Sequence, residues 1–323
     1  MMTIIVAVAI ILVVIVGSQL LKIAELRAAS KGELIYEVTE KESKFQGLLL
    51  FLGFFVFMGF FFWQMWAWYG LRLPESASIH GVDTDFLTDL TYYIITPVFI
   101  ITHALLLWFC FKYSYSSKRK SLFFSHSNKL EMIWTLAPSA VLTVLILMGL
   151  TSWNKIMTPI ADEEDHVLIE LTGQQFTWTA RYSGDDKKLG RSHVTLIEGV
   201  NATGVDATDP NAKDDKLVKG EFHLPVNVPV QFVFRSLDAI HSAYFPHFRS
   251  QMNCVPGIVT QFNFTPTITT KEMRKITNNT EFNYVLLCNK ICGAAHYNMQ
   301  MNIIVESQED YDKWLAEQKT FVE

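Results

Sequence analysis

One short stretch of the chain carries four side chains that bind soft metal ions. It reads CNKICGAAHYNM over residues 288–299 and offers the thiols of Cys288 and Cys292, the imidazole of His296 and the thioether of Met299. Soft sulfur ligands beside an imidazole select copper over hard cations such as magnesium and calcium, and a thioether argues against structural zinc. The sequence therefore predicts a copper site on this stretch.

Two cysteines four residues apart exceed the ligand set of a mononuclear blue-copper site, which uses one cysteine, two histidines and an axial methionine. Two thiolates that lie close together can bridge a pair of metal ions. A second histidine is available earlier in the chain, as His241 in the stretch SLDAIHSAYFPHF. A disulfide or a chance cluster is the alternative interpretation of the two cysteines.

The stretches CNKICGAAHYNM and DAIHS together resemble the binuclear copper (CuA) domain of cytochrome c oxidase subunit II. The resemblance implies a cupredoxin Greek key, in which the remote histidine and the C-terminal loop meet at one end. It also implies five side-chain copper ligands and one backbone carbonyl ligand, which are His241, Cys288, Cys292, His296, Met299 and the carbonyl of Lys290.

The apolar residues are concentrated in the first half of the chain. Half of the 323 residues are hydrophobic, and four apolar runs each approach the roughly 20 residues that cross a bilayer as a helix. These runs span residues 4–21, 47–69, 92–111 and 132–153. No such run follows residue 155, so we expect a membrane region of four transmembrane helices followed by an all-β, water-soluble region.

Lysine and arginine in short loops predict the orientation, because cytoplasmic loops are enriched in both. The loops after the first and third runs carry five each, whereas the loop after the second run has only Arg72 against four acids. The copper domain and both termini are therefore expected outside a bacterial cytoplasmic membrane.

The first run is expected to be a retained anchor, because MMT is not basic and no small-x-small cleavage site follows; a cleaved signal peptide is the alternative.

The fourth run begins EMIWTLAP, which matches the E-x-x-W-T-x-x-P start of the second helix in the subunit II hairpin. The third and fourth runs are then that hairpin, and the first two runs are additions to it. The resemblance implies that Glu131 lies near the mouth of a proton channel shared with the catalytic subunit. A carboxylate that stabilises a helix N-terminus through the macrodipole is the alternative for Glu131.

The family carries G-H-Q-W-x-W where this chain reads GQQFTW, with Phe176 at the first aromatic position and Trp178 at the second. In the family the first tryptophan passes electrons from the donor to copper, so Phe176 and Trp178 are the candidates for that role. Core packing is the alternative for Trp178.

Residues 183–217 are polar with nearly balanced charge, which predicts an exposed insertion without a strongly acidic docking face.

The expected organisation has four parts: two extra spans in 1–90, the hairpin in 91–155, the copper domain in 156–306 and a C-terminal helix and tail in 307–323. Several short strands with frequent turn residues predict a β-sandwich for the copper domain, in agreement with the cupredoxin-like fold. Ser307 is expected to cap the last helix. His80 is expected to be a solvated loop residue.

The resemblance implies subunit II of a haem–copper terminal oxidase. Such a subunit takes electrons from a cytochrome c-type donor and passes them to a haem in subunit I, where oxygen reduction is coupled to proton translocation. The donor is expected to be membrane-anchored or held in a stable complex, and subunit III is a further expected partner. The resemblance implies that haem and a second copper lie only in subunit I. The chain has no C-x-x-C-H motif, so a fused cytochrome c domain is not expected. No nucleic acid is expected as a partner.

Two other functions have to be compared with this one. A quinol oxidase subunit shares the fold but lacks the copper ligands, and a copper-delivery chaperone needs neither Met299 nor a membrane hairpin.

Lys290 stands where most of the family has a glutamate that reaches a magnesium ion. Because magnesium prefers oxygen ligands and an ammonium group repels it, we expect that magnesium site to be absent or rebuilt.

Overall fold

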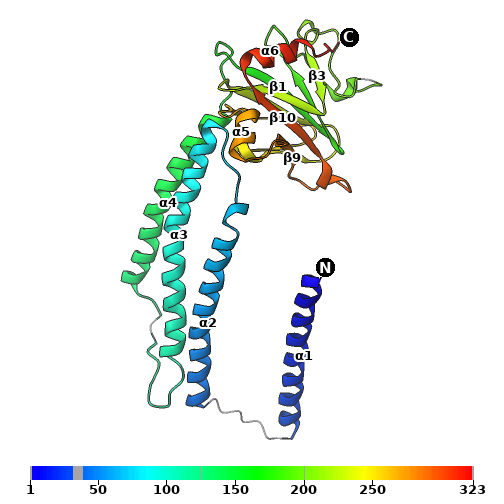
Figure 1. The fold of residues 1–323 in the computed structure, drawn as a ribbon. Helices are drawn as coiled ribbons and strands as arrows, with labels where there is room; N and C mark the ends of the chain where they lie inside the picture. Colours follow the sequence, from blue (N-terminus) through cyan, green and yellow to red (C-terminus); the bar gives the residue numbers. More distant parts are fainter. Residues whose placement is uncertain (1, 32–38, 124, 200, 322–323) are drawn as a thin grey trace. The chain divides into compact units, whose positions relative to one another are not determined.

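The computed structural model describes residues 2–31, 39–123, 125–199 and 201–321. Its α-helices are α1 (Met2–Ser30), α2 (Glu40–Ala67), α3 (Ile79–Lys112), α4 (Asn128–Met157), α5 (Thr270–Ile276) and α6 (Gln308–Ala316) (Figure 1). The chain forms two compact units, Met1–Gln64 with Phe99–Phe124, and Met65–Val98 with Ser125–Glu323. The second unit contains all ten strands that the described residues form.

Helices α2, α3 and α4 are long and apolar enough to cross a membrane. They contain most of the second, third and fourth apolar runs. Helix α1 covers the first run, and its crossing of the membrane stays a prediction. Helix α3 begins well before its apolar run, because the Ser78 hydroxyl accepts a hydrogen bond from the Gly81 N–H at 3.1 Å and so caps a polar first turn.

In the first unit, α2 packs closely against the C-terminal end of α3. A side chain at Gly47 would place its Cβ 2.9 Å from the Cys110 carbonyl oxygen, so only glycine allows this approach of the two backbones. The Phe51 ring lies 5.7 Å from Trp108 and 6.0 Å from Phe111, measured between centroids. The second apolar run is therefore an integral part of the helical packing.

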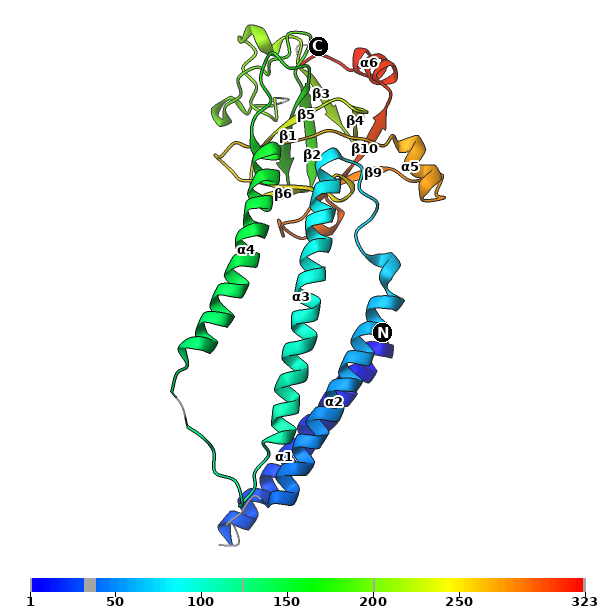
Figure 2. The same ribbon diagram turned by 90° about the vertical axis from the view of Figure 1, so that its left-hand side faces the viewer.

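The copper domain is a sandwich of two five-stranded sheets. One sheet has the order β3-β2-β1-β5-β8, with β1 (Val167–Gln174), β2 (Thr177–Tyr182), β3 (Lys216–Lys219), β5 (Val230–Ser236) and β8 (Thr260–Phe264). The other has the order β4-β10-β9-β6-β7, with β4 (Glu221–Pro225), β6 (His241–Phe245), β7 (Ser250–Cys254), β9 (Tyr284–Cys288) and β10 (Gln300–Glu306). Figure 2 shows α5 and α6 on the outside of these strands. The predicted all-β, cupredoxin-like fold is confirmed.

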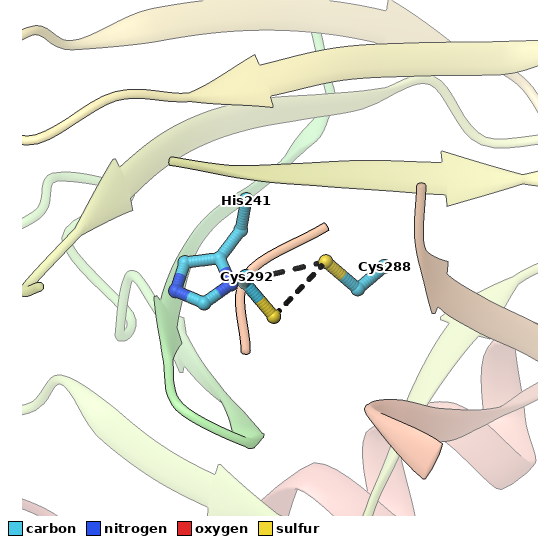
Figure 3. A group of neighbouring side chains, drawn as sticks. All are labelled: His241, Cys288 and Cys292. Atoms are coloured by element: carbon cyan, nitrogen blue, oxygen red, sulfur yellow. Dashed lines mark hydrogen bonds between the residues drawn. The ribbon is translucent and has the colours of Figure 1, made fainter. Parts of the chain in front are cut away.

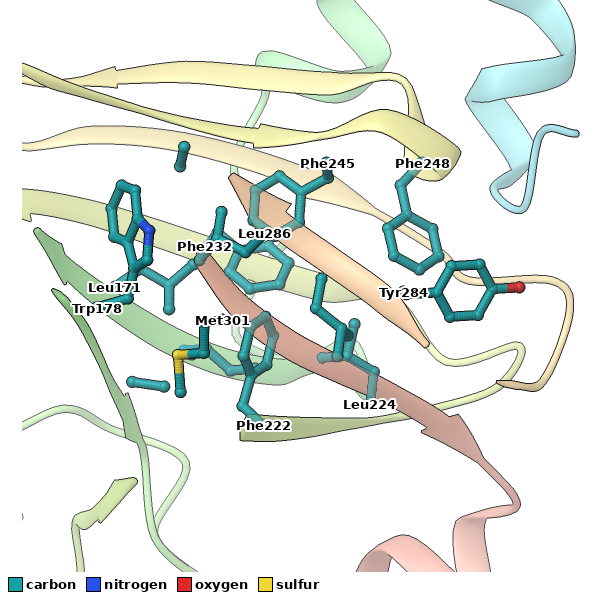
Figure 4. Packing of buried hydrophobic residues seen from close by; sticks show 14 of the residues in the cluster. Leu171, Trp178, Phe222, Leu224, Phe232, Phe245, Phe248, Tyr284, Leu286 and Met301 are labelled. Atoms are coloured by element: carbon teal, nitrogen blue, oxygen red, sulfur yellow. The ribbon is translucent and has the colours of Figure 1, made fainter. Parts of the chain in front are cut away.

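Aromatic and aliphatic side chains from both sheets fill the space between them (Figure 4). Phe222, Phe232 and Leu286 are fully buried, and each such side chain contributes about 1.5–3 kcal/mol relative to exposure. Trp178 belongs to the same core and is only 1% exposed. Trp178 therefore packs in the core, which is the alternative to an electron-entry role described for it.

A buried ion cluster anchors the polar insertion to the first sheet. The Arg181 guanidinium on β2 donates to Asp215 at 2.6 Å and to the Gly190 carbonyl at 2.8 Å, and it pairs with Glu170 on β1 at 3.0 Å. Burial raises the pKa of Asp215 to about 6, although the charge of Arg181 opposes this. The expectation of an exposed insertion was therefore wrong in part, because Asp215 pairs with a strand arginine and Val205 and Ala212 are also buried.

The N-terminal turns of α3 pack on the β-sandwich. Arg249, in the turn between β6 and β7, donates to both carboxylate oxygens of Asp85, at 2.7 and 2.9 Å. The ring of His80 lies against Phe262 at 5.5 Å and is only 6% exposed. The expectation that His80 is a solvated loop residue was wrong, because tertiary packing covers the first turn of α3. At the other end of the unit, Ser307 caps α6 as predicted.

Candidate metal centre

Strand pairing brings the remote histidine to the cysteine-rich loop. Cys288 is the last residue of β9 and His241 is the first residue of β6. These strands are antiparallel neighbours, and Cys288 pairs with Ala243, two residues beyond His241. Figure 3 shows the side chains of His241, Cys288 and Cys292 pointing toward one another. Their donor atoms all lie within 4.8 Å of one another.

The two cysteine sulfurs lie side by side, and each faces one imidazole. The sulfurs are 3.9 Å apart, far beyond the roughly 2 Å of a disulfide, so the disulfide alternative is wrong for this structure. Cys288 Sγ lies 3.8 Å from His241 Nδ1, and Cys292 Sγ lies 3.7 Å from His296 Nδ1.

Each sulfur also faces one further donor of the expected set. The Lys290 carbonyl oxygen lies 3.2 Å from Cys288 Sγ, and Met299 Sδ lies 3.8 Å from Cys292 Sγ. The structure therefore brings all six predicted donors together in two adjacent groups. Each group consists of one sulfur, one imidazole and one further donor. Two shared thiolates with separate imidazoles suit a pair of soft metal ions, so the residues fit a binuclear copper site.

The candidate centre is closed to solvent on most sides. His241 is fully buried, and Met299, Cys292 and Cys288 are 1%, 6% and 9% exposed. Burial, together with the neighbouring Cys288, raises the pKa of the Cys292 thiol to about 11. Without a metal this thiol keeps its proton at neutral pH, so metal binding must release it.

Asp238 orients the His241 ring, and sequence reasoning missed this residue. Asp238 Oδ1 lies 2.8 Å from His241 Nε2, which leaves Nδ1 directed at the sulfurs. The carboxylate also accepts hydrogen bonds from the N–H groups of Gln175 and Ala239. Partial burial alone would raise the pKa of Asp238, but these hydrogen bonds hold it below its usual value. The D-x-x-H spacing in DAIHS was the available signal.

Both candidate electron-transfer aromatics lie beside the centre. Trp178 is buried with its ring edge-on to His241, at a centroid distance of 6.0 Å. Phe176 is half-buried against the ligand loop: Gly293 has a φ of +148°, and a Cβ there would lie 2.8 Å from the Phe176 ring. The neighbouring Gln175 side chain donates to the Cys292 carbonyl. The β1–β2 turn is thus fastened directly to the ligand loop.

The remaining predicted residue, Glu131, is separate from the metal cluster. It lies in the first turn of α4, where its carboxylate accepts a hydrogen bond from the Ser127 N–H at 3.2 Å. This contact is the helix-end role named as the alternative. Sequence reasoning did not single out two other residues of the ligand loop, Ile291 and Tyr297, whose side chains are each 87% exposed.

A β-sandwich that holds two thiols, two imidazoles and a thioether at one end defines a protein of the CuA-binding, cupredoxin-like class. The model of the cytochrome c oxidase subunit II transmembrane domain matches residues 66–154, and that of the periplasmic domain matches residues 167–308. The chain belongs to the cytochrome c oxidase subunit II family. It is a membrane-anchored protein with a periplasmic domain of that family.

Two relatives identified by sequence agree with this assignment. The alternative cytochrome c oxidase subunit 2 of Bradyrhizobium diazoefficiens is 33% identical over 238 residues, which cover 73% of this chain and 80% of the relative. Cytochrome c oxidase subunit 2 of Cereibacter sphaeroides is 25% identical over 257 residues, which cover 76% and 77%. The solved periplasmic domain of subunit II of cytochrome oxidase from Bradyrhizobium japonicum is 22% identical, matches 50% of this chain and 95% of its own, and gives a TM-score of 0.32.

Proposed function

We propose that this protein is the subunit that receives electrons from a cytochrome c-type donor and passes them to a haem in subunit I. The observation that carries the proposal is the convergence of two thiols with two imidazole nitrogens, a thioether and a carbonyl oxygen. When bound, a copper pair supplies one-electron redox chemistry at this place. Oxygen reduction, haem and the second copper belong to subunit I.

The chain's own residues hold the donors and keep water out. Cys288, Cys292, His241, His296, Met299 and the Lys290 carbonyl would hold the copper pair, with both thiolates shared between the other donors. Asp238 fixes the ring of His241, and Gln175 fixes the carbonyl of Cys292. Such outer hydrogen bonds set the orientation and basicity of metal ligands, so they tune the site without touching the ion.

Partners and location follow from the proposed role. The domain would face the periplasm of a bacterial cytoplasmic membrane, with subunit I and subunit III beside it in the bilayer, and four spans including α1. The donor would approach Phe176 at the edge of the centre. Near-neutral charge in residues 183–217 supports a donor that is anchored or stably bound, because diffusional steering needs a dominant charge. Glu131 would also serve proton uptake, in addition to its helix-end contact.

Copper analysis of the purified protein tests the proposal. Two coppers per chain and a mixed-valence signal with one unpaired electron spread over two nuclei are expected. Cys288→Ser or Cys292→Ser should abolish that signal, whereas Met299→Leu should leave copper partly bound, since a thioether is the weaker ligand. One copper per unmodified chain would favour a copper-delivery chaperone, and no copper would favour a quinol oxidase subunit.

Lys290 gives this site a property of its own. Its side chain is exposed and pairs with no carboxylate in the described part of the chain, while its carbonyl faces Cys288. We expect the ammonium group to pair with a carboxylate of subunit I and to exclude magnesium from this boundary. Cells grown on manganese should then yield an oxidase without manganese coupled magnetically to the copper pair. A coupled signal would contradict the expectation.

A further inference from the structure

Two adjoining hollows lie at the end of α3: the larger is lined by α3 and the loop that follows, and the smaller also by the start of α2. One has a volume of about 1030 Å³ and the other about 720 Å³, and they share Ser114, Tyr115, Ser116 and Arg119. All their lining residues belong to the first unit. They begin just beyond the close approach of the two backbones at Gly47. Protein sites for small ligands commonly span about 300–1,000 Å³, so a lipid headgroup has room here.

Hydrogen bonds build the walls of these hollows. The N–H of Tyr115 donates to Ser43 Oγ at 2.8 Å, and Ser117 donates to Glu40 through both its N–H and its hydroxyl. Arg119 folds back and donates to the carbonyls of Lys112, at 2.7 Å, and Ser114. The loop is therefore fastened to the first turn of α2 at one side and to the last turn of α3 at the other.

The lining is strongly cationic. Five basic side chains contribute to it, which are Lys41, Lys44, Lys112, Arg119 and Lys120. The only acid in the lining is Glu40, whose carboxylate is engaged by Ser116 and Ser117. Within the described ranges no carboxylate forms an ion pair with any of the five cations. A concave surface with unpaired positive charge and several hydroxyl groups suits a phosphate.

Apolar groups in the same lining distinguish a lipid from a free anion. Phe109, Tyr113 and Leu122 line the larger hollow, and Leu122 is 85% exposed. Together the two hollows lie at the end of α3 and the start of α2, two helices of membrane length, where lipid headgroups meet the protein. Basic pockets between transmembrane helices on the cytoplasmic side bind anionic headgroups.

We propose that the two adjoining hollows, lined together by Lys41, Lys44, Lys112, Arg119 and Lys120, form one basic site that binds the phosphate of an anionic phospholipid, whose acyl chains leave along Phe109 and Tyr113 of the larger hollow. The site depends on α2, the helix that sequence analysis placed outside the subunit II hairpin. It gives that helix a role apart from the copper centre.

Native mass spectrometry of the full-length protein in detergent, titrated with phosphatidylglycerol, tests the proposal. The test variant is Lys44→Gln/Lys112→Gln/Lys120→Gln. The matched control removes the same number of charges outside the hollow, as Lys22→Gln/Arg27→Gln/Lys31→Gln. We expect one tightly bound lipid in the unmodified and control proteins, and affinity weaker by about fivefold per removed lysine in the test variant.

Three further comparisons complete the test. Phosphatidylcholine should bind weakly to all variants, and inorganic phosphate alone should not displace phosphatidylglycerol. The charge-retaining variant Lys44→Arg/Lys112→Arg/Lys120→Arg should bind like the unmodified protein, and an unchanged copper content will show that each variant is folded. Equal weakening in test and control variants, equal binding of phosphatidylcholine, displacement by phosphate, or loss of binding in the arginine variant would each overturn the proposal.

Discussion

Replacing Asp238 by alanine removes the group that orients His241 without touching the other donors. The 2.8 Å contact between Asp238 Oδ1 and His241 Nε2 would be lost, together with the acceptor for the N–H groups of Gln175 and Ala239. Loss of such an outer partner weakens metal binding by about 10- to 100-fold, or about 1.4–2.8 kcal/mol. The Asp238 side chain is 31% exposed, so water can replace part of its hydrogen bonding. We therefore expect about tenfold weaker copper binding.

The assay is competition for copper against a chelator of known affinity. Asp238→Asn keeps an acceptor oxygen and removes the charge, so its affinity should fall between those of the unmodified protein and Asp238→Ala. Asp165→Ala is the matched control, because Asp165 is 85% exposed and pairs with Lys187, away from the ligands. Copper stoichiometry should be unchanged in all three variants. If Asp238→Ala retains copper as well as Asp165→Ala does, the orienting role is refuted.

Three further outcomes follow from other parts of the chain. With its native donor, turnover should change little with ionic strength, since residues 183–217 carry no dominant charge; a steep loss of rate between low and physiological salt would contradict this. Burial raises the pKa of Asp215 from 3.8 to about 6, so the folded chain binds this proton more tightly than the unfolded chain does. The free energy of unfolding should therefore fall by up to about 3 kcal/mol as pH rises from about 4 to about 6. In Asp215→Asn, urea unfolding should show a smaller change of this free energy with pH. An unchanged pH dependence in the variant would count against the assignment to Asp215. Asp85→Asn should destabilise the protein by about 1–3 kcal/mol in thermal unfolding, because the Arg249 side chain is 6% exposed and keeps its charge. Asp83→Asn breaks an exposed 3.8 Å pair with Lys155 and should cost less than about 1 kcal/mol. Equal losses of stability in the two variants would refute the argument.

Local spacing along the chain was enough to predict the donors of the candidate centre. Cys288, Cys292, His296 and Met299 lie within twelve positions, and their chemical softness depends on residue type alone. The transmembrane helices were equally accessible, because a span needs only an uninterrupted apolar run. The family assignment and the β-sandwich, both confirmed, rest on these local patterns.

Contacts between distant segments decided the rest. Strand pairing of β6 with β9 brings His241 to the sulfurs, and the loop before His241 places Asp238 behind the ring. The burial of His80 and Asp215 also depends on partners far away in the chain, Phe262 and Arg181. Hydrophobic periodicity cannot report such pairs, because it registers the polarity of a segment and carries no information about which other segment will cover it. The sequence by itself thus determined which atoms are available as ligands, and the tertiary structure determined which of them meet and what holds them there.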